Sequence, residues 1–166
     1  MGPTEPTGPI CDQRRPEAAG LLIVAYGNDL MGDDGAGPAL AVQLGDDLPE
    51  GVRVIIRHQL TPELADDVSR SAHVVFVDAR VPDGNLDAVL SPLVGHGAGA
   101  IGHVCDPASL MDIARTVFGA APDAWLLSLP TSSMALGEGL SEIAADGVQH
   151  GISLLRQHMR SLGYTA

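Results

Sequence analysis

A glycine-rich loop near the start of the chain gathers several carboxylates. The loop follows an apolar run, reads YGNDLMGDDGAG and carries Asp29, Asp33 and Asp34. A glycine-rich turn between a strand and a helix suggests a dinucleotide site, in which backbone N–H groups hold a pyrophosphate. Here the spacing is not GxGxxG, and the three carboxylates would repel a phosphate. The charge of the loop therefore excludes a dinucleotide.

The paired aspartates of this loop also stand where a helix is expected to begin. An Asp at a helix N-terminus commonly caps free backbone N–H groups and interacts favourably with the helix dipole. Capping accounts for one of Asp33 and Asp34. The other is then expected to point into the crevice beside the loop.

Two further segments carry residues that bind metals. Asp78 ends the apolar run AHVVFV and would face Asp34 if the two strands are neighbours, although an Asp in this position is more often a turn former. His96 and His103 flank the loop GHGAGAIGH, which can reach the same edge of the sheet, although a single loop histidine is more often only a surface residue. Two carboxylates and one imidazole would suit a borderline divalent ion such as Ni²⁺ or Zn²⁺.

The other nucleophiles and histidines are weaker candidates. The sequence has no GxSxG elbow, and the serines near the last apolar run have no obvious base. Cys105 is interpreted as a partly buried, inert thiol. His58 is a weaker candidate for the crevice, whereas His150 and His158 are expected to be solvated on the final helix.

The elements that must position these residues alternate along the chain. Apolar runs predict strands over 20–25, 51–58, 72–77, 86–93 and 125–129. Helices are expected to begin at Asp33, at Thr61 as N-cap before Pro62, at Asp106 and near Ser141. This order predicts a three-layer α/β fold, with a mostly parallel five-stranded sheet and helices on both faces. Ligands bind such sheets beyond the carboxyl ends of the strands.

The amino-acid composition excludes several classes of chemistry and of binding partner. The chain has 166 residues and a formal charge of −12, and all nine basic residues are Arg. Without lysine, Schiff-base chemistry, pyridoxal phosphate anchoring and the P-loop are excluded. The negative charge argues against nucleic acid and anionic membranes. No apolar stretch is long enough to span a bilayer.

The length predicts one domain and the cysteines indicate a compartment. Residues 1–19 are expected to be a disordered leader, and 20–166 a single α/β domain. Cys11 and Cys105 are far apart and form no CxxC pair, which suits a reducing cytosol. We therefore expect a cytoplasmic protein.

Three elements in this order resemble a known family. The segment GND-LMGDDGAGP after an apolar strand, the VDA that ends the third strand, and a loop histidine before a helix are similar to the [NiFe]-hydrogenase maturation endopeptidases. The similarity covers roughly residues 20–163, and HQLTPEL at 58–64 also looks like the second-strand exit of some members. The glycine-rich segment is the most specific of these elements.

The resemblance implies a protease domain and a specific activity. Members remove a C-terminal peptide from the precursor of the hydrogenase large subunit after nickel has been inserted. The nickel belongs to the substrate, so no permanent cofactor is expected, and Zn²⁺ or Cd²⁺ could substitute for it. By motif position, the residues that contact the metal and carry catalysis fall on Asp34, Asp78 and His103, with Asp33 and His96 as alternates.

Three hypotheses follow. The first is a substrate-specific endopeptidase, expected to be a monomer, in which either the metal activates the carbonyl or a water, or a carboxylate activates water directly. The second is a non-enzymatic chaperone that docks on the same nickel-loaded precursor. The third is an acidic α/β domain whose aspartates only cap helices.

Overall fold

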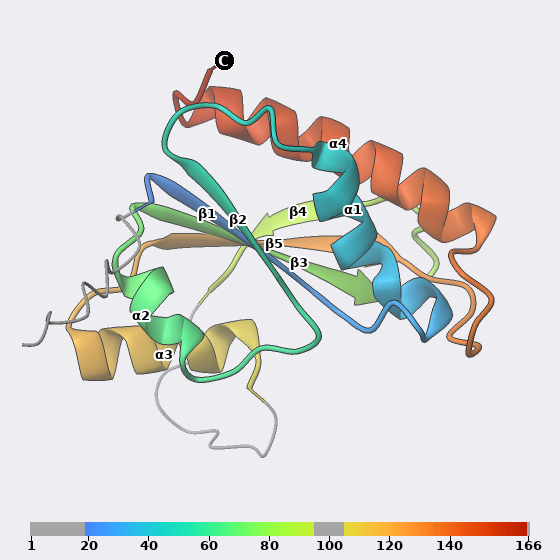
Figure 1. Ribbon diagram of the computed structural model, residues 1–166, viewed down its shortest axis with the longest axis horizontal. Helices are drawn as coiled ribbons and strands as arrows, with labels where there is room; N and C mark the ends of the chain where they lie inside the picture. Colours follow the sequence, from blue (N-terminus) through green and yellow to red (C-terminus); the bar gives the residue numbers. More distant parts are fainter. Residues whose placement is uncertain (1–18, 95–104, 166) are drawn as a thin grey trace, which may run out of the picture.

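The computed structural model describes residues 19–94 and 105–165, which form one twisted sheet covered by helices (Figure 1). The strands are β1 (Leu21–Tyr26), β2 (Val52–Arg57), β3 (His73–Arg80), β4 (Val89–Pro92) and β5 (Asp123–Pro130). The helices are the 3-10 helix η1 (Gly32–Gly35) and α1 (Ala36–Leu44), α2 (Leu64–Ser69), α3 (Pro107–Phe118) and α4 (Glu142–Ser161).

The sheet has the order β2-β1-β3-β5-β4. β1 is parallel to both β2 and β3, and β3 is parallel to β5, whereas β4 joins β5 antiparallel at one edge. Helices α1 and α4 cover one face, and α2 and α3 cover the other (Figure 1). The predicted three-layer, mostly parallel five-stranded fold is therefore confirmed. No helix within 19–94 and 105–165 is long and apolar enough to cross a membrane.

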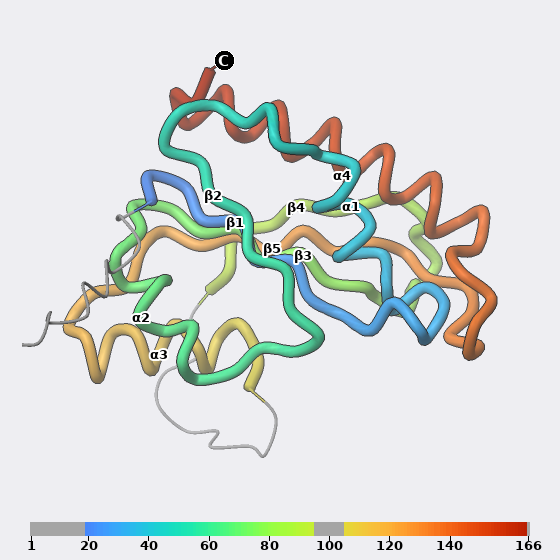
Figure 2. Tube along the Cα trace, viewed as in Figure 1, coloured from blue at the N-terminus to red at the C-terminus, as the bar shows by residue number. Residues whose placement is uncertain are grey.

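The central strand β1 shows why its sequence is apolar without a break. Leu21, Ile23 and Ala25 belong to the core under α1 and α4, whereas Leu22 and Val24 belong to the core under α2 and α3. A parallel strand covered on both faces buries all its side chains, so it needs a continuous apolar run. The tube in Figure 2 shows α4 running across the face that it shares with α1.

Two of the four expected helix starts are confirmed. Asp106 caps α3, since its side chain accepts a hydrogen bond from the Ser109 N–H at 2.7 Å. Ser141 caps α4 by accepting from the Ala144 N–H at 3.2 Å. Both caps satisfy a backbone donor that the first turn of a helix leaves without a partner.

The other two starts differ from the prediction. Neither Asp33 nor Asp34 caps a helix: the N-cap positions of η1 and α1 are Met31 and Gly35, and neither makes a side-chain cap. Both carboxylates bind elsewhere, as described below. The expected helix at Thr61 begins as a turn, and α2 itself starts only at Leu64.

Two strands also have different bounds. β3 does not end before Asp78 but continues to Arg80, because β5 pairs with it along this stretch, with Asp78 opposite Ser128. The strand expected over 86–93 is shorter and spans Val89–Pro92, which pairs with β5.

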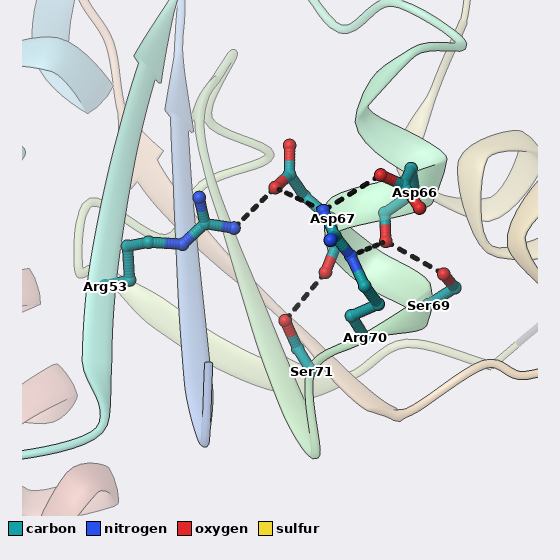
Figure 3. A network of polar contacts seen from close by, with 6 residues as sticks. All are labelled: Arg53, Asp66, Asp67, Ser69, Arg70 and Ser71. Carbon is teal, nitrogen blue, oxygen red and sulfur yellow. Dashed lines mark hydrogen bonds and ion pairs between the residues drawn. The ribbon is translucent and has the colours of Figure 1, made fainter. Parts of the chain in front are cut away.

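A network of charged residues holds α2 against β2 (Figure 3). The Arg53 Nη2 lies 2.6 Å from the Asp67 Oδ1, and the Arg70 Nη2 lies 2.8 Å from the Asp66 Oδ2. The Ser71 hydroxyl donates to the Asp67 carbonyl at 2.8 Å. These side chains are partly exposed, so each ion pair contributes only modestly to stability.

The amino ends of the strands carry an aromatic cluster. The rings of Trp125 and His158 meet edge to face with centroids 4.5 Å apart, and His73 Nδ1 lies 2.9 Å from the Tyr164 hydroxyl. The expectation that His158 is solvated is therefore wrong, because α4 turns it toward the sheet. Burial, with a smaller effect of the nearby His73, lowers the pKa of His158. His150, by contrast, is exposed as expected.

Candidate functional site

Asp33 is a completely buried carboxylate at the start of the site. Its Oδ2 accepts hydrogen bonds from the Ser132 N–H at 2.6 Å, the Ser133 N–H at 2.9 Å and the Ser141 hydroxyl at 2.7 Å. Its Oδ1 accepts one from the Ser141 N–H at 2.6 Å. Asp33 therefore ties the loop after β1 to the segment between β5 and α4.

These donors also keep Asp33 ionised. Burial alone would raise its pKa, but the hydrogen bonds from Ser132, Ser141 and Ser133 outweigh burial and hold the pKa below its usual value. A carboxylate with this many internal donors is an anchor for the loop. This favours Asp34 over Asp33 as the carboxylate that the loop offers to a ligand.

Asp34 is partly exposed and is held by the turn that it faces. Its Oδ2 accepts a hydrogen bond from the Asn28 N–H at 2.7 Å, and the Asn28 Oδ1 in turn accepts from the Leu30 N–H at 3.0 Å. The turn needs Gly27, whose φ is +140° and whose added Cβ would lie 1.9 Å from the Asp34 carbonyl oxygen. Only glycine fits such a close approach.

Asp78 lies in β3, next to the end of β1. The Tyr26 hydroxyl donates to the Asp78 Oδ2 at 2.8 Å. Burial raises the pKa of Asp78 and the negative charge of Asp34 raises it further, while hydrogen bonds from Tyr26 and the Ala79 backbone oppose this. Asp34 and Asp78 accept hydrogen bonds from Asn28 and Tyr26, which are two positions apart, so two of the three predicted contact residues lie at the same end of β1.

Tyr26 is a residue of the site that the sequence does not single out, because it falls just beyond the apolar run 20–25 and within the glycine-rich loop. Its pKa is raised by burial and then by the charge and hydrogen bond of Asp78, so the phenol stays a hydrogen-bond donor. The alternation of side chains along a strand is the signal that could have placed Tyr26 beside Asp78. Tyr26 follows Leu22 and Val24 on one face of β1, and Asp78 follows Phe76 on the same face of β3.

The start of α3 lies on the same side of the sheet. The charge of Asp106 contributes to the raised pKa of Tyr26, and Cys105 packs against the apolar core under α2 and α3. Burial raises the pKa of the Cys105 thiol, and the charges of Asp106 and Glu63 raise it further. This agrees with the interpretation of Cys105 as an unreactive, partly buried thiol.

The predicted histidines His103 and His96 lie outside the described residues. Within 19–94 and 105–165, no group of three or more His, Cys, Asp and Glu side chains is placed to hold a metal ion. The described part of the chain thus supplies two carboxylates, Asp34 and Asp78, at the carboxyl edge of the sheet.

A surface hollow of about 290 Å³ is lined in part by the same loop. It is lined by residues of the loop, η1, α1 and the segment before α4, among them Asp29, Pro38, Val42 and Leu140. Neither Asp34 nor Asp78 lines it. The hollow is therefore not the space between the two carboxylates.

Solved structures with this fold are numerous. The hydrogenase maturating endopeptidase HybD from E. coli superposes with a TM-score of 0.70 at 19% identity, over 86% of this chain and 93% of that one. The [NiFe] hydrogenase maturation protease HycI from Thermococcus kodakarensis KOD1 gives 0.66 at 22% identity, over 87% and 94%. A hydrogenase 2 maturation peptidase from Thaumarchaeota archaeon SCGC_AB-539-E09 gives 0.63 at 23% identity, over 87% and 99%.

No protein-family model and no curated protein sequence matches the chain. The similarity is therefore carried by the structure, and at these identities it concerns the fold. The chain is a three-layer α/β protein with the fold of the hydrogenase maturation proteases, as the resemblance over residues 20–163 implied.

Proposed function

We propose that the chain is an endopeptidase that removes the C-terminal extension from the nickel-loaded precursor of a [NiFe]-hydrogenase large subunit. The observation that supports this proposal is that Asp34 and Asp78 are both hydrogen-bonded to the segment 26–28 at the carboxyl end of β1, in a fold shared with hydrogenase maturation endopeptidases. Ligands of open parallel sheets bind at this edge. The protein is proposed to act as a cytoplasmic monomer.

The third contact is proposed to be His103. It lies two positions before Cys105, a distance of at most about 7 Å along an extended chain. Cys105 packs against the same apolar core as Tyr26, whose hydroxyl binds Asp78. His96 is separated from Cys105 by a longer stretch and remains the alternate.

Oxygen and nitrogen ligands suit a metal that belongs to the substrate. Two carboxylates and an imidazole can contact Ni²⁺, Zn²⁺ or Cd²⁺ without the thiolates that would compete for nickel with cysteines of the precursor. The mutual repulsion of Asp34 and Asp78 contributes to the raised pKa of Asp78 and would be relieved by a cation between them. This pair therefore favours docking of a metal-loaded precursor over an empty one.

Water activation is proposed to involve Asp78. A raised pKa makes a carboxylate a stronger base, so Asp78 is better suited than an ordinary aspartate to take a proton from the attacking water. The substrate's nickel would polarise the scissile carbonyl or lower the pKa of that water. Asp34, held by the Asn28 N–H, then acts chiefly as a metal contact.

The test is to incubate the purified protein with nickel-loaded and nickel-free precursor and to measure the mass of the large subunit. We expect loss of a C-terminal peptide only from the loaded form. D34A, D78N and H103A should abolish cleavage while remaining folded. D29A is the matched control, because Asp29 lies exposed in the same loop.

Two outcomes would contradict the proposal. An unchanged mass of the loaded precursor would exclude the endopeptidase, and a stable complex without cleavage would instead favour a docking chaperone. Full activity of D34A and D78N would show that cleavage occurs at another site.

A further inference from the structure

A single tripeptide at the carboxyl end of β1 binds both carboxylates of the site. Within Tyr26-Gly27-Asn28, the Asn28 N–H donates to the Asp34 Oδ2 at 2.7 Å, and the Tyr26 hydroxyl donates to the Asp78 Oδ2 at 2.8 Å. Within this tripeptide, the backbone binds the carboxylate of Asp34 and a side chain binds that of Asp78, which also accepts a hydrogen bond from the Ala79 backbone. A backbone N–H is present whatever the residue, whereas the phenol is specific to tyrosine.

We propose that Tyr26 is a positioning residue, whose hydroxyl fixes the carboxylate of Asp78 in the orientation that the reaction uses. The inference rests on the proposed function, in which Asp78 meets the substrate. It adds a residue that the resemblance does not assign, since the motif shared with the maturation endopeptidases covers Gly27 and Asn28 but leaves the type of residue 26 open.

The geometry explains how the phenol can do this. The Tyr26 ring packs against the apolar core under α2 and α3, and both Tyr26 and Asp78 are partly buried. β1 and β3 pair in register up to Ala25 and Val77, so the next residues along the two strands are neighbours. A ring fixed in this way holds its hydroxyl at one place. With Oδ2 bound to it, rotation of the Asp78 carboxylate is arrested and Oδ1 keeps one direction.

The loss of this hydroxyl is expected to affect turnover more than binding. Partners that orient a metal-contacting group typically change activity by about 10- to 100-fold when they are removed. The precursor would still be recognised through the rest of its contact surface. We therefore expect Y26F to cleave saturating nickel-loaded precursor about 10- to 100-fold more slowly, with a half-saturating precursor concentration within about threefold of the wild type.

The matched control is Y164F. This substitution also removes one partly buried hydroxyl. In the wild type, the Tyr164 hydroxyl lies 2.9 Å from the His73 Nδ1 at the opposite edge of the sheet. Both variants keep their rings and should remain folded by circular dichroism, with rates normalised to the folded fraction. A purely structural effect of losing a phenol would slow the two variants alike, whereas the proposal expects Y164F to cleave within about twofold of the wild type.

A second measurement does not depend on cleavage. In protein labelled with ¹³C at the aspartate carboxyls, D78N identifies the Asp78 resonance, which should shift in Y26F and stay in place in Y164F. If the wild type does not cleave, the proposed function falls, while this spectrum still decides whether the phenol holds Asp78. A Y26F rate within about twofold of the wild type, with D78N inactive, would overturn the positioning role, as would an unmoved Asp78 resonance.

Discussion

Replacing Asp33 by Asn changes the most heavily hydrogen-bonded carboxylate of the loop with almost no change in shape. If the amide oxygen takes the place of Oδ2, it keeps the bonds from the Ser132 N–H, the Ser133 N–H and the Ser141 hydroxyl. The amide nitrogen then replaces Oδ1 and faces the Ser141 N–H, so that two donors oppose each other. One hydrogen bond is lost, and the other three are made to a neutral amide oxygen in place of a charged carboxylate.

The expected cost follows from these losses. A hydrogen bond to a charged group contributes about 1.5–3 kcal/mol and a neutral one about 0.5–1.5 kcal/mol, and a buried donor left without a partner costs about 1–3 kcal/mol. Because the three retained bonds share one acceptor, their losses do not add fully. We expect D33N to lower the free energy of unfolding by about 3 kcal/mol, and D33A by about 4–5 kcal/mol. This is a large part of the roughly 5–15 kcal/mol of a typical domain.

Urea denaturation at pH 7 measures the effect. D29N is the matched control, because Asp29 lies in the same loop but is exposed, and its change should stay within about 0.5 kcal/mol. A D33N protein within about 1 kcal/mol of the wild type would refute the reasoning, since it would mean that the buried donors do not need the charge.

The same pair of proteins gives a pH test. The pKa of Asp33 is lowered from 3.8, so its ionised form contributes stability that is present above pH 3.8 and is lost as the pH falls through the lowered pKa. The stability difference between the wild type and D33N should therefore be constant near neutrality and shrink on acidification below pH 3.8. A difference that grew in acid would contradict the assignment.

Two further changes test the packing around the site and at the opposite edge. In G37A the new Cβ would lie 2.7 Å from the Tyr26 carbonyl and 2.9 Å from the Val77 carbonyl, both backbone atoms, so we expect a loss of about 1–3 kcal/mol in urea denaturation. An unchanged midpoint would show that α1 can move away from the strand ends. His158 has a lowered pKa, so the wild type should lose stability as the pH falls below about 6.5, and H158Q should reduce this loss whereas H150Q should not. The same slope between pH 8 and pH 5 in all three proteins would exclude His158 as the cause.

The strands could be predicted because their signal is local. Residues 21–25 and 74–77 are apolar without a break, which is the pattern of a parallel strand covered on both faces. The ends of a strand were less predictable where they depend on pairing with a neighbouring strand. β3 continues through Asp78 only because β5 lies beside it, and no property of residues 78–80 alone indicates this.

The sequence indicates which aspartates belong to the site, but it does not indicate what each of them binds. Capping was the local explanation for Asp33, whereas its actual partners Ser132 and Ser141 lie 99 and 108 positions away. The Tyr26 hydroxyl likewise meets Asp78 across 52 positions. Contacts at such separations arise from the packing of the whole sheet, so a motif can place an aspartate in a loop without showing what it binds.

The two adjacent aspartates of the loop have linked roles, because one fixes the position of the other. Asp34 stands near Asp78 although like charges repel, and such an arrangement persists only when the surrounding structure enforces it. Asp33 supplies this constraint, because its four hydrogen bonds fix the start of η1 from the protein interior. The stability of the loop and the placement of its exposed carboxylate therefore depend on neighbouring residues of one type. A change that loosens Asp33 should weaken both together, whereas a change at Asp34 should relieve repulsion and leave the fold intact.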